Sequence, residues 1–130
     1  MLCSVAIAGI VPHLVKRLVA RERPNRTRVR VPRHGVPKSG HAWDSFPSGH
    51  AVHVGALAQS AMRFAPDSVR PFVWPGAAAL AGTRIVLLAH YLSDVLAGLA
   101  LGVTIDGLVA RLFAGLHGRH RRAPATRRAA

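Results

Sequence analysis

The chain has 130 residues, half of them apolar, and its Lys and Arg residues outnumber Asp and Glu by 18 to 5. That length suits one domain with a single core, and a nucleic-acid-binding protein and a membrane protein with basic loops both fit the charge. The arginines crowd into residues 21–38 and 119–128, outside the long apolar stretches, and no basic segment interleaves aromatic residues as a base-stacking surface would. We therefore interpret the chain as a membrane protein and rank nucleic-acid binding last.

Four apolar segments predict four membrane helices, at residues 1–15, 51–65, 71–89 and 92–116. Each is close to or slightly below the roughly 20 residues that cross a bilayer core. The first is expected to run on to about Ala20, and it lacks the basic start and the A-x-A end of a signal peptide. Small residues are abundant in all four, which suits close helix packing in lipid. The sequence therefore predicts an all-α transmembrane helical bundle.

The segments outside these helices are polar and basic. Residues 25–45 form a loop with Pro and Gly, in which the alternation TRVRV is too brief to argue a strand. Residues 117–130 read as a basic, disordered tail, which leaves residues 1–116 as the membrane domain. The balance of basic residues weakly favours a cytoplasmic tail, with the long loop on the opposite face.

Polar clusters lie at the ends of the apolar segments, where a bundle would bring them together. Residues 16–24 read KRLVARERP, and a helix would put Lys16 and Arg23, seven residues apart, on one face. Residues 47–50 read PSGH. This stretch suits a helix start capped by Ser48, and equally a phosphate site at a helix N-terminus.

A third cluster, TRIVLLAHYLSD, covers residues 83–94. His90 and Asp94 stand at i and i+4, close enough for the carboxylate to orient the imidazole. Arg84 lies inside an apolar segment, where a charge is a candidate functional residue. With the other clusters this gives three cations, a serine hydroxyl, free backbone N–H groups and two histidines. Such a set suits phosphoryl transfer without a metal, because cations neutralise the phosphoryl oxygens while one histidine attacks and the other protonates the leaving group.

Simpler interpretations exist for each residue. His50 and His90 taken singly would be capping or core histidines, and Arg84 would extend to the membrane interface. Lys16 and Arg23 would be the basic flank of a membrane helix.

The patterns K-x6-RP, PSGH and [S/T]R-x5-H-x3-D, in this order, resemble the three signature motifs of the type 2 phosphatidic acid phosphatase (PAP2) superfamily. The match runs from Lys16 to Asp94, and each motif falls at a segment boundary. The resemblance implies that His90 is the nucleophile that forms a phosphohistidine, that Asp94 orients and activates it, and that His50 is the general acid. It also implies that the phosphoryl oxygens are held by Lys16, Arg23, Ser48, Gly49 and Arg84.

The resemblance further implies a helical bundle that needs no metal ion and no cofactor. Membrane members usually have six transmembrane helices, of which the first two would precede Met1, and Thr83 stands where a serine is more usual. In bacterial members the site usually lies at the outer surface. We therefore expect an integral protein of a bacterial plasma membrane, with an extracytoplasmic site and with lipid substrate and membrane lipids, rather than nucleic acid, as partners.

The expected activity is hydrolysis of a lipid phosphate or diphosphate. Candidate substrates are polyprenyl diphosphates, polyprenyl-phosphoryl sugar phosphates and phosphatidic acid or phosphatidylglycerol phosphate, and the sequence does not choose among them. One alternative is a truncated, non-catalytic relative that binds anionic lipid. Another is a vanadate-dependent haloperoxidase, which shares the site but belongs to soluble and much larger proteins.

A few residues have no counterpart in the motifs. His53 is interpreted as a pore-lining or satisfied core histidine, and Asp106, a carboxylate inside an apolar segment, should be paired or protonated. Arg111 and a residue on another helix both stay open as its partner. His34 and His41 are expected to be solvated in the loop. The single cysteine, Cys3, excludes an intrachain disulfide.

Overall fold

The computed structural model describes residues 2–19, 21–24, 43–87 and 89–121, and for residues 117–121 it describes the backbone alone. The described part holds four helices: α1 (Leu2–Leu18), α2 (Gly49–Phe64), α3 (Arg70–Val86) and α4 (Leu92–Arg121). One isolated bridge joins Arg21 to Asp44. The prediction of an all-α fold is confirmed.

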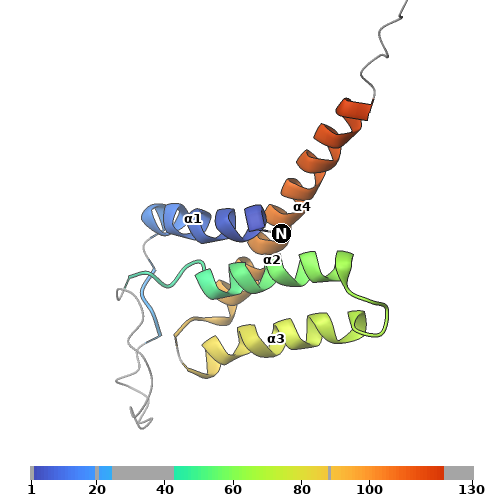
Figure 1. Ribbon diagram of the computed structural model, residues 1–130. Helices are drawn as coiled ribbons and strands as arrows, with labels where there is room; N and C mark the ends of the chain where they lie inside the picture. The colour runs from blue at the N-terminus through green and yellow to red at the C-terminus, as the bar shows by residue number, and fades with distance from the viewer. Residues whose placement is uncertain (1, 20, 25–42, 88, 122–130) are drawn as a thin grey trace, which may run out of the picture.

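Helix α2 lies at the centre and contacts each of the other three helices. It runs antiparallel to α3 below it and to α1 above it, while α4 crosses behind and projects away at its C-terminal end (Figure 1). The C-terminal ends of α1 and α3 therefore lie on the same side of the molecule as the N-terminal ends of α2 and α4 (Figure 1). This arrangement gathers the three polar clusters of the sequence at one end of the bundle.

Small residues let α2 and α4 pack closely. A Cβ atom added to Gly98 would lie 2.7 Å from the carbonyl oxygen of Ser48, and one added to Gly102 would overlap the Val52 carbonyl. The core on either side of α2 is correspondingly built from alanine and β-branched residues, among them Ala51, Ala56, Ala81, Val95 and Ile105. The close approach holds the start of α4 against the PSGH segment.

One stretch of the described chain, Leu92–Leu116 within α4, is long and apolar enough to cross a membrane. Helices α1, α2 and α3 have 17, 16 and 17 residues, fewer than the roughly 20 that a perpendicular span requires. The four predicted helices are present, but the prediction that all four span a membrane has support for only one.

One predicted boundary differs from the structure, and another lies outside the described residues. Helix α4 continues to Arg121, so the first five residues of the expected tail are helical, and residues 122–130 lie outside the described part. The predicted loop is described only from residue 43, so the TRVRV stretch, His34 and His41 also lie outside it.

The prediction that Lys16 and Arg23 share a helix face is wrong, because α1 ends at Leu18. The Arg21 N–H donates to the Trp43 carbonyl at 3.1 Å, and the Arg21 carbonyl accepts from the Ser45 N–H at 3.0 Å. These bonds take the place of helical ones. Arg23 also precedes Pro24, and a residue before proline disfavours the helical conformation.

Candidate active site

The PSGH segment starts α2 and is fastened to α4. The Ser48 hydroxyl accepts the backbone N–H of Ala51 at 3.4 Å, so the predicted N-cap is confirmed. The Ser48 N–H donates to the Asp94 carbonyl at 3.1 Å. Gly49 and His50 form the first turn of α2, and His50 is exposed.

His90 lies in the connection between α3 and α4 and is buried. Its Nδ1 atom is 2.7 Å from the carbonyl oxygen of Ser45. Because a carbonyl can only accept, Nδ1 carries the proton and the neutral ring keeps its lone pair on Nε2. Burial is the main cause that lowers the pKa of His90 below its ordinary value, against the opposing effect of the bond to Ser45. A buried, neutral imidazole with a free Nε2 lone pair has the chemistry of a nucleophile.

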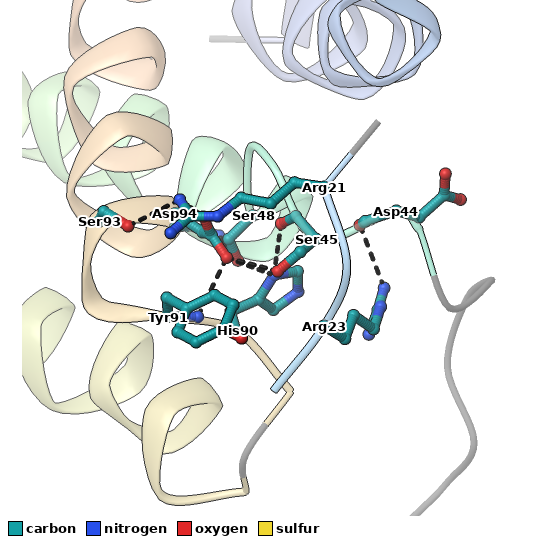
Figure 2. Close-up of polar contacts among 10 residues, drawn as sticks. Arg21, Arg23, Asp44, Ser45, Ser48, His90, Tyr91, Ser93 and Asp94 are labelled. Carbon is teal, nitrogen blue, oxygen red and sulfur yellow. Dashed lines mark hydrogen bonds and ion pairs between the residues drawn. The ribbon is translucent and has the colours of Figure 1, made fainter. Parts of the chain in front are cut away.

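Asp94 is fully buried in the first turn of α4 and accepts three hydrogen bonds (Figure 2). The Ser45 hydroxyl donates to Oδ2 at 2.5 Å, the Tyr91 N–H donates to Oδ2 at 3.0 Å, and Arg21 Nη1 donates to Oδ1 at 2.7 Å. The His90 Nδ1 atom is 3.9 Å from Oδ2, which is beyond hydrogen-bond reach. The expected direct contact of Asp94 with the imidazole is thus replaced by contacts of both residues with Ser45.

The predicted cations lie around the two histidines. Arg84, in the last turn of α3, places Nη2 3.3 Å from His50 Nδ1, and its buried Nε has no hydrogen-bond partner among the described residues. Lys16 lies in the last turn of α1, and Arg23 donates to the Asp44 carbonyl at 3.4 Å. The charges of Arg23 and Lys16 both act on His90 and lower its pKa further.

The structure thus brings every predicted site residue to one end of the bundle. These residues are Lys16, Arg23, Ser48, Gly49, His50, Arg84, His90 and Asp94. In the described part of the chain, no group of three or more His, Cys, Asp or Glu side chains could hold a metal ion. The converging groups are cations and N–H donors, which suit an anion such as a phosphate.

Two residues of the site were not predicted, Arg21 and Ser45. Arg21 also donates to the Ser93 hydroxyl at 2.9 Å, and its guanidinium lies over the Tyr91 ring, 4.7 Å from the centroid. Both residues stand inside or beside the motif segments, but their side-chain bonds to Asp94 join residues 73 and 49 positions apart. No local spacing could reveal such contacts, and the only signal was their position between recognised residues.

The two residues without a motif counterpart are satisfied elsewhere. The half-buried His53 bonds the Gly49 carbonyl through Nδ1 at 2.8 Å, so its ring is satisfied within α2. Asp106, fully buried on α4, pairs with Arg63 of α2 and accepts the Ser60 hydroxyl at 2.9 Å. Of the two partners left open for Asp106, the interhelical one is therefore confirmed, and Arg111 is exposed.

Comparison with known proteins shows the family of the chain. The profile of the PAP2 superfamily matches residues 1–117. The chain is 38% identical over 116 residues to a lipid A 1-phosphatase of Rhizobium johnstonii, an alignment that covers 85% of this chain and 46% of that protein. It is 38% identical over 103 residues to a decaprenylphosphoryl-5-phosphoribose phosphatase of Mycobacterium tuberculosis, covering 79% of this chain and 54% of that protein. No solved structure gives a significant match.

This chain belongs to the PAP2 superfamily, as its three motifs predicted. It spans about half the length of the curated relatives it matches.

Proposed function

We propose that this protein is a membrane phosphatase that hydrolyses a lipid phosphate or diphosphate through a phosphohistidine on His90. The observation that carries the proposal is the setting of His90. Its Nδ1 proton is held by a main-chain carbonyl, so its Nε2 lone pair is available at the end of the bundle that also holds His50 and a set of cations.

In the first step, His90 Nε2 attacks the phosphorus atom and the bond from phosphorus to the leaving oxygen breaks. His50, as its imidazolium, gives that oxygen a proton. In the structure the His50 Nδ1 atom faces Arg84 Nη2. A bound phosphate dianion would favour the imidazolium and draw the guanidinium to its own oxygens.

In the second step, water attacks the phosphohistidine. The P–N bond breaks, inorganic phosphate leaves, and His90 recovers its neutral ring. His50 now accepts the proton of the water, the reverse of its first role. Lys16, Arg23 and Arg84 would neutralise the charge on the phosphoryl oxygens in both steps, together with the N–H groups at the start of α2.

The exposed surface of the helices supports a lipid environment. Large apolar side chains are exposed on all four helices, among them Leu14 on α1, Phe64 on α2, Phe72 and Leu80 on α3, and Leu112 on α4. Exposed apolar surface on this scale is unusual for a soluble monomer, and α4 contains a span-length segment. Both relatives are named as phosphatases of lipid-linked phosphates, so we propose a lipid phosphate at a membrane surface as the substrate class. The basic C-terminal segment favours a cytoplasmic tail. Because the site lies at the other end of α4, we propose an extracytoplasmic site, in a bacterial plasma membrane.

The test is phosphate release by the detergent-purified chain, with EDTA present, from a panel of polyprenyl diphosphates, lipid sugar phosphates and phosphatidic acid. Wild type is compared with His90→Ala and with a control, His13→Ala, which removes an exposed histidine of α1. We expect release by wild type and the control, and none by His90→Ala. No release from any substrate by folded wild type would overturn the proposal, and binding of anionic lipid without turnover would then favour a non-catalytic relative.

A further inference from the structure

Arg21, at an unspecified position of the first motif, and Ser45, just before the second, make the contacts that surround His90 and Asp94. We propose that Arg21 and Ser45 are positioning residues of the reaction: with Asp94 they fix the main-chain carbonyl that holds the Nδ1 proton of His90. This inference rests on the proposed function, because it assigns a role in that reaction.

Hydrogen bonds anchor the N–H and the hydroxyl of Ser45, and its carbonyl binds His90. Its N–H donates to the Arg21 carbonyl at 3.0 Å, and its hydroxyl donates to Asp94 Oδ2 at 2.5 Å. Its own carbonyl then accepts the His90 Nδ1 proton at 2.7 Å. Ser45 is completely buried, so water cannot replace any of these bonds. The position of this carbonyl decides the tautomer and the orientation of the imidazole.

Arg21 holds Ser45 by two routes. Its backbone forms the bridge to residues 43–45, and its guanidinium forms an ion pair with Asp94 at 2.7 Å. The same guanidinium bonds the Ser93 hydroxyl and lies over the Tyr91 ring. A fully buried carboxylate requires compensation of its charge, and Arg21 is the cation that supplies it.

The contacts of Arg21 distinguish a positioning role from that of a phosphate ligand. The Arg21 guanidinium is engaged with Asp94, Ser93 and Tyr91 (Figure 2). Asp94 is 3.9 Å from the imidazole, so its influence on the orientation of the ring passes through Ser45. Loss of either Arg21 or the Ser45 hydroxyl should therefore loosen His90 without removing a contact to substrate.

The variants are Arg21→Gln, Arg21→Lys and Ser45→Ala in the full chain, with Arg17→Gln as a control that removes an exposed arginine from the end of α1. The first readout is kcat and KM for the best lipid phosphate of the panel. We expect Arg21→Gln and Ser45→Ala to lower kcat about 10- to 100-fold with KM unchanged, since small misplacements of a reacting group cost rate in this range. Arg21→Lys keeps the charge but lacks the planar guanidinium, so its kcat should lie between those of wild type and Arg21→Gln. Arg17→Gln should match wild type.

A double variant tests whether Arg21 acts on His90 through Asp94. In an Asp94→Asn background, Arg21→Gln should add little further loss if Arg21 acts through Asp94. Fully additive losses would overturn the proposed coupling. A rise in KM with kcat unchanged would instead make Arg21 a substrate ligand and would also overturn the proposal.

The second readout does not depend on turnover. Ring ¹⁵N spectra of histidine-labelled protein, with the His90 signals assigned from His90→Gln, should show the Nδ1–H tautomer in wild type and a mixture in Ser45→Ala and Arg21→Gln. If wild type is inactive but the tautomer changes in the variants, the proposed function fails while the positioning contacts stand. An unchanged tautomer in both variants would overturn the positioning role whatever the activity.

Discussion

Helix α4 carries two buried carboxylates, Asp94 and Asp106, twelve residues apart, or roughly 18 Å along the helix. Their partners are the same in kind. Asp94 pairs with Arg21 and accepts the Ser45 hydroxyl, while Asp106 pairs with Arg63 and accepts the Ser60 hydroxyl. Both ion pairs join α4 to a distant part of the chain.

The surroundings of the two carboxylates differ. The serine beside Asp94 also holds His90, and the cations Lys16 and Arg23 act on that ring. The polar side chains beside Asp106, in a cavity of about 230 Å³, are Ser4, Ser60 and Arg63, and the rest of its lining is apolar. A buried carboxylate paired with an arginine is therefore no sign of a catalytic site by itself. What distinguishes Asp94 is that its serine partner, Ser45, also forms a hydrogen bond with a histidine, His90.

The largest expected effect concerns activity. Asp94→Asn should lower kcat for lipid-phosphate hydrolysis about 10²-fold or more, because the anchors of Ser45 and hence of His90 are weakened. Asp106→Asn, the matched control, should stay within about twofold of wild type. Phosphate release by the two purified variants checks this, and equal losses would mean that the two sites do not differ in the way proposed.

The free energy of unfolding should respond to a change at Asp106. Asp106→Asn removes the charge that pairs with Arg63 and weakens the bond from Ser60, so the free energy of unfolding should fall by about 2 kcal/mol. Unfolding by denaturing detergent, followed by helical circular dichroism, measures the change. A variant as stable as wild type would show that this ion pair contributes nothing net, as happens for some buried pairs.

A smaller effect is expected at the contact that places both carboxylates against α2. Gly102 lies between them, and a Cβ atom there would overlap the Val52 carbonyl. Gly102→Ala should destabilise the protein by about 1 kcal/mol, since overpacking outweighs the gain in helix propensity. Gly107→Ala on the same helix meets nothing within 4 Å and should stabilise it slightly. The same detergent titration compares the two, and a stabilising Gly102→Ala would argue against the close approach of α2 and α4.

The sequence predicted the helices well because apolar runs and the PSGH cap are local signals, and spacing within short motifs was enough to single out His50, Arg84, His90 and Asp94 as candidates. It predicted the wrong conformation at Arg23, although Pro24 was a visible reason for the chain to leave the helix. Contacts between distant segments were not predictable. The bridge from Arg21 to residues 43–45 and the acceptance of the His90 proton by Ser45 depend on how the helix ends meet.

The smallest effect is on the titration of His90. Burial lowers its pKa below 6.5, while the charge of Asp94 raises it. The midpoint of the ring's titration should therefore lie below the ordinary histidine value, and the neutral imidazole should persist to lower pH than in a free histidine. Removing the anion in Asp94→Asn disfavours the imidazolium and should lower the pKa further, whereas Asp106→Asn should leave it unchanged.

Ring ¹⁵N shifts of His90, followed from about pH 8 down to about pH 4, measure the titration midpoint in wild type, Asp94→Asn and Asp106→Asn without substrate. A wild-type midpoint at or above 6.5 would contradict the effect of burial. A midpoint that moves equally in the two variants would show that the His90 ring responds to the net charge of α4, and not to the carboxylate attached to Ser45. A shift confined to Asp94→Asn would assign that electrostatic link to Asp94 alone.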